Sequence, residues 1–193
     1  GIGLGANVLL QEVGAEVDPL GPANRLIFAV GPFQATRITG SGKWIVASKS
    51  PLTGILGFSA AGGEWGASLK RAGYEALIVQ GVAEKPVYLW IDNGRVEIRD
   101  ATQIWGTDSY EAIDLIRSDL GKLKMSVAAI GQAGEKKVAI ANIVVDKHSF
   151  AGRCGLGAVM GSKNLKGIAV RGTREVEVSD PDRVKELVKS LGK

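Results

Sequence analysis

Residues 59–81 read SAAGGEWGASLKRAGYEALIVQG, and residues 150–172 read FAGRCGLGAVMGSKNLKGIAVRG. The two stretches align without a gap. Each reads as a loop of small residues, then a short helix, then an apolar strand that ends at glycine. The shared order of elements predicts an internal duplication. Identical residues at aligned positions include Gly66 and Gly157, Ala67 and Ala158, Val79 and Val170, and Gly81 and Gly172.

A second match lies upstream of each copy. Residues 26–32 read LIFAVGP and residues 126–132 read SVAAIGQ, with an alanine and a glycine at equivalent places. The offset between these segments differs slightly from that of the first match, as expected when loops change length after a duplication. Both halves are therefore predicted to begin with an apolar strand.

The doubled glycine-rich loop is a candidate anion site. The first turn of a helix carries unpaired N–H groups and the positive end of the helix dipole, so a loop without bulky side chains lets an anion approach. Two related loops imply two anions, carried by one ligand with two phosphorylated arms or by two identical ligands. The alternative is that the glycines only permit positive φ or close packing of helix on sheet.

Composition limits the class of protein. The 193 residues are enough for one domain, or two small ones, and the net charge of +4 comes from scattered basic residues. This scatter argues against nucleic-acid binding, for which a concentrated basic stripe is typical. No apolar run is long enough to cross a membrane, and a single cysteine cannot form a disulfide or an iron–sulfur cluster. We expect a cytoplasmic protein without a membrane partner. Because the chain opens at Gly1, we also expect a fragment.

Hydrophobic periodicity predicts alternating helices and strands. The clearest element is the hairpin at 86–99, where Asn93-Gly94 suits a primed turn. Helix 108–120 should be capped by Thr107 or Asp108 and stopped by Gly121, and the last helix should be capped by Ser179. The other expected elements are helices at 5–13, 63–72 and 156–163, strands at 25–31, 43–49, 75–80, 125–131, 137–145 and 166–171, and a loop at 146–155.

Familiar catalytic patterns are scarce. The glycines at 1–5 lack dinucleotide-binding spacing, and Gly42-Lys43 lacks the remaining residues of a phosphate-binding P-loop. His148 is the only histidine, and either a structural role or a place beside an anion fits it. Cys154 lies near a predicted helix start, which would lower its thiol pKa, but a small buried thiol is the favoured interpretation. The chain therefore reads as a binding half rather than a complete catalyst.

Four segments, taken together, resemble the N-terminal domain of the aldehyde:ferredoxin oxidoreductase family of tungsten enzymes. They occur in the family's order and spacing. The resemblance implies an α+β fold, internally duplicated, with two stacked β-sheets flanked by helices in αββα-like layers. The segments are AVGPFQATRITGSGKWIVASKSPLTG at 29–54, GGEWGASLKRAGYEALIVQGVAEKPVYLWI at 62–91, EIRDATQIWG at 97–106 and GRCGLGAVMGSKNLKGIAVRG at 152–172.

The resemblance also implies a cofactor: tungsten, or molybdenum in some relatives, held by two pyranopterins whose phosphates are bridged by Mg²⁺. Two phosphorylated arms are what the doubled loop would require. The backbone carbonyls of Ala60 and Phe150 would face the Mg²⁺. The residues that would meet the two phosphates are Ala60, Ala61, Gly62 and Gly63 in the first loop, and Ser149, Phe150, Ala151, Gly152 and Arg153 in the second.

The chain departs from the family pattern at three positions. Lys43 stands where arginine is frequent, which keeps the positive charge but loses the planar fork that can bridge two groups. Ala60 stands where asparagine is common, and Ser149 replaces an arginine beside His148. The contacts to the phosphates are expected to be largely main-chain, so pterin binding should tolerate these changes better than substrate choice does.

We expect residues 1–178 to form the pterin-binding domain, with repeats at about 1–100 and 101–178, and the helix at 179–193 to lead towards downstream domains. In the family, the cysteines of a [4Fe–4S] cluster lie in those domains, so this chain would not bind the cluster. The resemblance implies an enzyme that oxidises a small aldehyde to a carboxylic acid and passes electrons to ferredoxin or another carrier. The alternatives are the catalytic subunit of an aromatic acyl-CoA reductase, or a non-catalytic phosphopterin-binding module. The sequence leaves a homodimer open.

Overall fold

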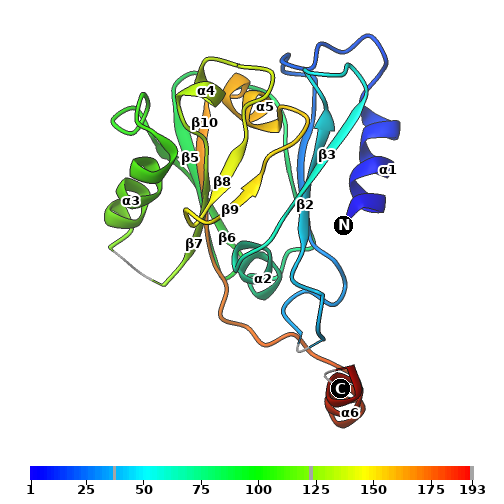
Figure 1. The fold of residues 1–193 in the computed structure, drawn as a ribbon. Coiled ribbons are helices and arrows are strands. Elements are labelled where there is room, and N and C mark those ends of the chain that lie inside the picture. The colour runs from blue at the N-terminus through cyan, green and yellow to red at the C-terminus, as the bar shows by residue number, and fades with distance from the viewer. Residues whose placement is uncertain (37, 122–123, 192–193) are drawn as a thin grey trace.

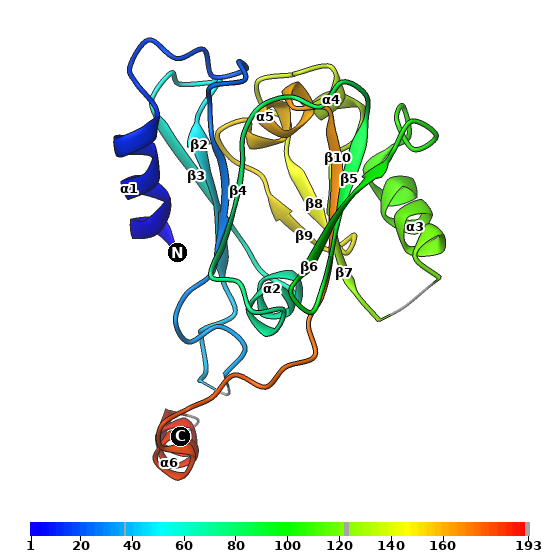
Figure 2. The same cartoon turned by 180° about the vertical axis from the view of Figure 1, so that it is seen from behind.

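The structure is a computed structural model that describes residues 1–36, 38–121 and 124–191. Two β-sheets face each other, and a helix covers the outer face of each (Figures 1 and 2). Helix α1 (Ile2–Glu12) packs on the first sheet, and helix α3 (Ser109–Asp119) packs on the second. This confirms the expected α+β fold with αββα-like layers.

The first sheet is antiparallel with the strand order β3-β2-β1-β4. Helix α2 (Trp65–Arg71) connects β3 to β4. The sheet's strands are β1 (Leu26–Ala29), β2 (Trp44–Lys49), β3 (Leu56–Ala61) and β4 (Ala76–Val79).

The second sheet has the order β6-β5-β10-β7-β8-β9. Helix α4 (Gln132–Glu135) follows β7, and helix α5 (Leu156–Ser162) connects β9 to β10. The sheet's strands are β5 (Val87–Asp92), β6 (Arg95–Asp100), β7 (Ser126–Ala129), β8 (Ile143–Val145), β9 (Ser149–Ala151) and β10 (Leu165–Arg171).

The duplication is visible in the strand orders. The run β9-β8-β7-β10 repeats the order β3-β2-β1-β4, and all the pairings within each run are antiparallel. The hairpin β5–β6 follows the first run in sequence but joins the second sheet, through a parallel pairing of β5 with β10. The proposed repeat boundary near residue 100 stays a prediction.

The helix that connects two strands in each half also packs against the sheet of the other half. Helix α2 of the first half contacts β7 and β10 of the second sheet, while α5 of the second half contacts β1 and β2 of the first. Both helices lie between the sheets in Figures 1 and 2. Trp44 and Trp65 meet there with ring centroids 4.4 Å apart, and both side chains are fully buried. Burial of aromatic side chains contributes a large share of the free energy that stabilises a small core.

Most of the predicted elements are present. Asp108 is the N-cap of α3, since its carboxylate accepts hydrogen bonds from the backbone N–H groups of Tyr110 and Glu111, and Gly121 follows the helix with φ of +74°. Asn93 and Gly94 both have positive φ, as a primed hairpin turn requires. Among the described residues, none of the helices has both the length and the apolar character needed to span a bilayer.

Four local predictions were wrong. Strand β3 was not foreseen, and the expected loop at 146–155 contains β9; both are edge strands rich in small residues, whose β-propensity is weak. The expected strand at 137–145 shrinks to β8, because Lys137 has φ of +58° and ends any extended run there. The last helix, α6 (Pro181–Leu191), is capped by Asp180 rather than Ser179, since the Asp180 side chain accepts from Arg183 N.

Lys163 is a buried cation at the end of α5. The residue is 2% exposed, and its Nζ donates to the carbonyl oxygens of Asn24 at 2.7 Å and Gly81 at 3.3 Å. Burial, with a contribution from the positive charge of Arg25, lowers the pKa of Lys163 from 10.5 to about 8. The lysine ties the second half of the chain to two loops of the first.

This lowered pKa predicts that the protein gains stability as the pH rises from about 8 to about 10. In this range the unfolded chain holds a proton on Lys163 that the folded chain has lost, so raising the pH favours the folded state. Tyr88, whose pKa is raised to about 12 by burial and by Asp119, opposes this only above its ordinary pKa of 10.0. Urea unfolding at the two pH values measures the gain. The variant Lys163→Met should lack it, and an equal gain in that variant would contradict this assignment.

Candidate functional site

The candidate site lies where β3 and β9 come together. Each is the outermost strand of its own sheet. They are linked by a hydrogen bond from Arg153 N to Ser59 Oγ at 3.2 Å. A second link runs from Ser50 Oγ to the carbonyl oxygen of Cys154 at 2.9 Å. The two glycine-rich segments that the sequence singled out are therefore side by side.

The structure places the predicted residues partly on strands. Ala60 and Ala61 end β3, and Ser149, Phe150 and Ala151 form β9, so these five are strand residues rather than loop residues. Their pattern alternates: Ala60 and Phe150 are exposed, whereas Ala61 and Ala151 are buried. The glycines and Arg153 follow the strand ends.

The two loops face each other at their tips. A methyl group on Gly62 would lie 3.7 Å from Lys43 Nζ and 3.8 Å from Ser149 Oγ. A methyl group on Gly63 would lie 3.4 Å from Ser149 Oγ and 3.9 Å from His148 Nε2. Lys43, His148 and Ser149 therefore lie around the first loop, and Lys43 and Ser149 are among the residues predicted to contact the cofactor.

One buried side chain positions this first loop, and a second positions the segment of Lys43 beside it. The Trp44 indole N–H donates to the carbonyl oxygen of Gly62 at 3.0 Å. The buried amide of Gln34, with its nitrogen turned towards the backbone, donates to the carbonyl oxygens of Ser41 at 2.9 Å and Lys43 at 3.0 Å. Sequence reasoning missed both residues. Trp44 carried a usable signal, since a buried tryptophan needs an acceptor for its N–H.

A groove of about 700 Å³ opens between the strands. Its floor is apolar, because Phe58 and Phe150 are each 45% exposed on the same side. Its lining residues are Leu56, Phe58, Ser59, Ala60, Phe150, Gly152, Arg153 and Cys154. A groove with an apolar floor and a few polar groups at its edge is typical of a small-molecule site.

The edge of the site is positively charged. Lys43, His148 and Arg153 are exposed. Within residues 1–36, 38–121 and 124–191, the side chains of these three make no hydrogen bond or ion pair. Lys43 and Arg153 are cations without carboxylate partners, and such cations favour an anionic ligand. In the same described ranges, no three side chains of His, Cys, Asp or Glu gather in a way that could hold a metal ion.

The glycines of the two segments lack a side chain for two different physical reasons. A Cβ on Gly66 would lie 2.7 Å from the Trp44 ring, and a Cβ on Gly157 would lie 2.4 Å from the Asn142 carbonyl oxygen. Close packing therefore explains both, as the alternative interpretation of these glycines held. Gly62 and Gly152, which do not align with each other in the two copies, have no positive φ. A Cβ on Gly152 would meet nothing within 4 Å, so the lack of a side chain there leaves room in the groove.

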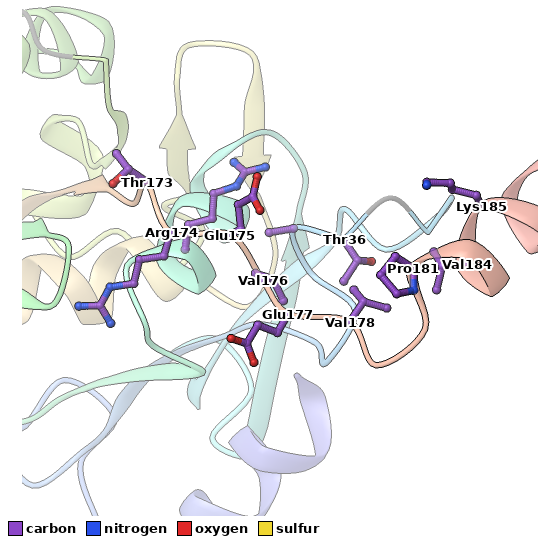
Figure 3. Close-up of a pocket in the computed structure, with 12 residues that line it drawn as sticks. Thr36, Thr173, Arg174, Glu175, Val176, Glu177, Val178, Pro181, Val184 and Lys185 are labelled. Atoms are coloured by element: carbon purple, nitrogen blue, oxygen red, sulfur yellow. The ribbon is translucent and has the colours of Figure 1, made fainter.

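Another cavity, of about 830 Å³, lies elsewhere. It sits between the extended segment 173–178, the loop at Ala35 and Thr36, and the start of α6, as Figure 3 shows. Its walls carry charges of both signs, from Arg174, Glu175, Glu177 and Lys185. None of the predicted site residues lines it, so the groove between β3 and β9 is the better candidate.

Comparison with known proteins gives concordant matches. The family of aldehyde ferredoxin oxidoreductase N-terminal domains matches residues 1–172. A tungsten-containing aldehyde ferredoxin oxidoreductase of Pyrococcus furiosus is 48% identical over 98% of this chain and 32% of its own length. The WOR-like subunit of an aliphatic sulfonate oxidoreductase of the same organism is 39% identical over 100% of this chain and 33% of its own length. The chain thus spans about a third of these curated relatives.

A solved structure matches equally well. The active site complex BamBC of benzoyl coenzyme A reductase, in complex with 1,5-dienoyl-CoA, contains a chain that superposes with a TM-score of 0.95. The two are 42% identical, and the match covers 98% of this chain and 29% of the other.

Proposed function

Because the chain belongs to the family of aldehyde ferredoxin oxidoreductase N-terminal domains, we propose that it forms the base on which a tungsten pterin cofactor sits in an aldehyde-oxidising enzyme. The chain is part of an oxidoreductase of the tungsten-containing family. The complete protein would convert an aldehyde and water into a carboxylic acid, two protons and two electrons. A [4Fe–4S] cluster in downstream domains would pass the electrons to ferredoxin.

One observation carries this proposal: two edge strands from duplicated sheets, each followed by glycine, border a single groove, with Arg153 in its lining and Lys43 beside the first loop. A cofactor with two phosphorylated arms needs two equivalent backbone cradles and positive charge beside them. Gly62 and Gly152 leave the cradles open, and Phe58 and Phe150 offer an apolar surface to flat ring systems. The residues present therefore fit the group.

We assign one cofactor phosphate to each half of the duplicated chain. Ala60, Ala61, Gly62 and Gly63 would hold one phosphate through their backbone, and Ser149 to Arg153 would hold the other. The backbone carbonyl oxygens of Ala60 and Phe150 would face a bridging Mg²⁺, which prefers oxygen ligands. Lys43 would supply one positive charge without the planar fork of arginine. When bound, the metal centre supplies two-electron redox chemistry that amino-acid side chains lack.

A second candidate is the catalytic subunit of an aromatic acyl-CoA reductase. The match to the benzoyl coenzyme A reductase complex favours it, since that match is nearly as high in identity as the match to the aldehyde enzyme. The two functions would differ in residues that contact the substrate, and these would lie mainly in the remaining two thirds of such a protein. We also propose a cytoplasmic location and leave a homodimer as one assembly to test.

The full-length protein purified from its host distinguishes the two. We expect aldehyde-dependent reduction of ferredoxin and no reaction with a cyclic dienoyl-CoA. Oxidation of the dienoyl-CoA without aldehyde activity would replace the first function with the second. A protein that carries pterin but lacks both activities would support a non-catalytic cofactor-binding module.

A further inference from the structure

The turn between β8 and β9 has an unusual backbone. Asp146 and Lys147 are consecutive non-glycine residues with φ of +49° and +68°. The hydrogen bond from His148 N to Val145 O, at 3.1 Å, closes the turn. The hairpin β5–β6 uses similar values, +48° and +94°, but places Asn93 and Gly94 there. Left-handed backbone at a lysine costs about 1–2 kcal/mol, so something else must stabilise this turn.

Helix α3 and strand β7 supply the stabilising contacts: α3 contacts both left-handed residues, and β7 contacts Asp146. The Asp146 carboxylate is 9% exposed; its Oδ1 accepts from Arg117 Nη2 at 2.6 Å and from Val127 N at 2.9 Å, and its Oδ2 accepts from Ser126 Oγ. Lys147 Nζ lies 2.5 Å from Asp114 Oδ2. Arg117 and Asp114 are one turn apart on α3, so one helix holds both left-handed residues.

The strained turn leads straight into the candidate site. The next residues are His148 and Ser149, whose side chains lie close to the first loop: Ser149 Oγ is near Gly62 and Gly63, and His148 Nε2 is near Gly63. A shift of the turn would move both. From this arrangement we propose that Arg117 and Asp114 are positioning residues for the second cofactor loop, a role that rests on the function proposed above. They hold the turn so that the backbone of 149–153 faces the first loop.

Stability of α3 is a weaker explanation for these pairs. The helix is already anchored by Ala112, Ile113 and Ile116, which are fully buried against the second sheet. The Asp114 side chain is 61% exposed, and such an exposed pair adds little to global stability. What the two pairs share is the turn that they contact.

The test uses the full-length enzyme loaded with its cofactor and follows release of tungsten at raised temperature by elemental analysis. Arg117→Met should release tungsten about tenfold faster, as loss of an outer contact typically does at a metal site. Arg117→Lys should stay near the wild-type rate, because Asp146 accepts a single N–H from this residue. Asp114→Asn should accelerate release more modestly. Adding Lys147→Gly to Asp114→Asn should restore the wild-type rate, since glycine takes positive φ without help.

Ile113→Val is the matched control, because it removes one buried methyl group from the same helix without touching the turn. It should lower the unfolding temperature and leave the tungsten release rate unchanged. The inference fails if Arg117→Met releases tungsten at the wild-type rate, or if Ile113→Val accelerates release as much as Arg117→Met does. A wild-type enzyme without tungsten or pterin would instead overturn the proposed function itself.

Discussion

Replacing Gly152 with valine is expected to remove the cofactor from the protein without unfolding it. Gly152 is exposed in the groove, does not have positive φ, and would place a Cβ in open space with nothing within 4 Å. The fold should therefore accept the side chain with a stability change within about 0.5 kcal/mol. A cofactor that rests on the backbone of 149–153 would collide with it. We expect cofactor content to fall at least about tenfold, or about 1.4 kcal/mol of binding free energy.

Gly14→Val is the matched control, since Gly14 also has nothing within 4 Å of a Cβ but does not line the groove. Tungsten and pterin are measured per chain in both variants of the full-length protein, beside their unfolding temperatures. Full cofactor content in Gly152→Val would show that the backbone of the second loop is not where the cofactor rests.

Replacing Gly161 with alanine should have the opposite effect and destabilise the fold. A Cβ at Gly161 would lie 1.9 Å from the backbone oxygen of Gly134, where α5 crosses α4. Backbone cannot move aside as a flexible side chain can, so the two helices must separate. We expect a loss of about 3 kcal/mol or more in the free energy of unfolding.

Gly3→Ala provides the comparison, because Gly3 lies within α1 and a Cβ there would meet nothing within 4 Å. That change should stabilise the protein by about 0.5–1 kcal/mol, since alanine is the better helix former. Urea unfolding of both variants measures the difference. A Gly161→Ala protein as stable as the wild type would mean that α4 and α5 do not pack as closely as described.

The duplication could be predicted from the sequence because packing fixes several of its glycines. Gly172, for example, would place a Cβ 2.2 Å from the Ser68 backbone oxygen, so no other residue fits there. Gly66 and Gly157 are held in the same way by Trp44 and by Asn142. Packing therefore keeps glycine at both Gly66 and Gly157, whereas Gly81, the equivalent of Gly172, has φ of +72° and open space where a Cβ would lie.

The strands that border the site could not be predicted in the same way. Strand β3 contains Gly57, where a Cβ would come within 2.7 Å of Cys154, so its small residues reflect contact with the other half of the chain. Strand β9 is only three residues long and pairs on one side only. Local propensity carries little information about either strand, since both are set by contacts between distant segments.

The sequence pattern predicted the doubled loop as an anion site, whereas the individual contact residues were assigned by resemblance. The sequence does not show that a Cβ would have open space at Gly152 but would clash with the backbone at Gly157. This difference is seen only in the structure. The approach of Lys43 to Gly62 and Ser149 likewise depends on the way the two sheets meet. The contact of Gln34 with the backbone of Ser41 and Lys43 could not be predicted from a pattern for the same reason.

Whether these two loops form a cofactor base is tested by measuring tungsten and pterin in the full-length protein purified from its own host. We expect tungsten in proportion to the protein chain, twice as much pterin, and iron from the downstream cluster. Molybdenum in place of tungsten, with the same pterin ratio, would keep the cofactor site and change only the metal. A protein without pterin and without either metal would contradict the claim that these two loops form a cofactor base.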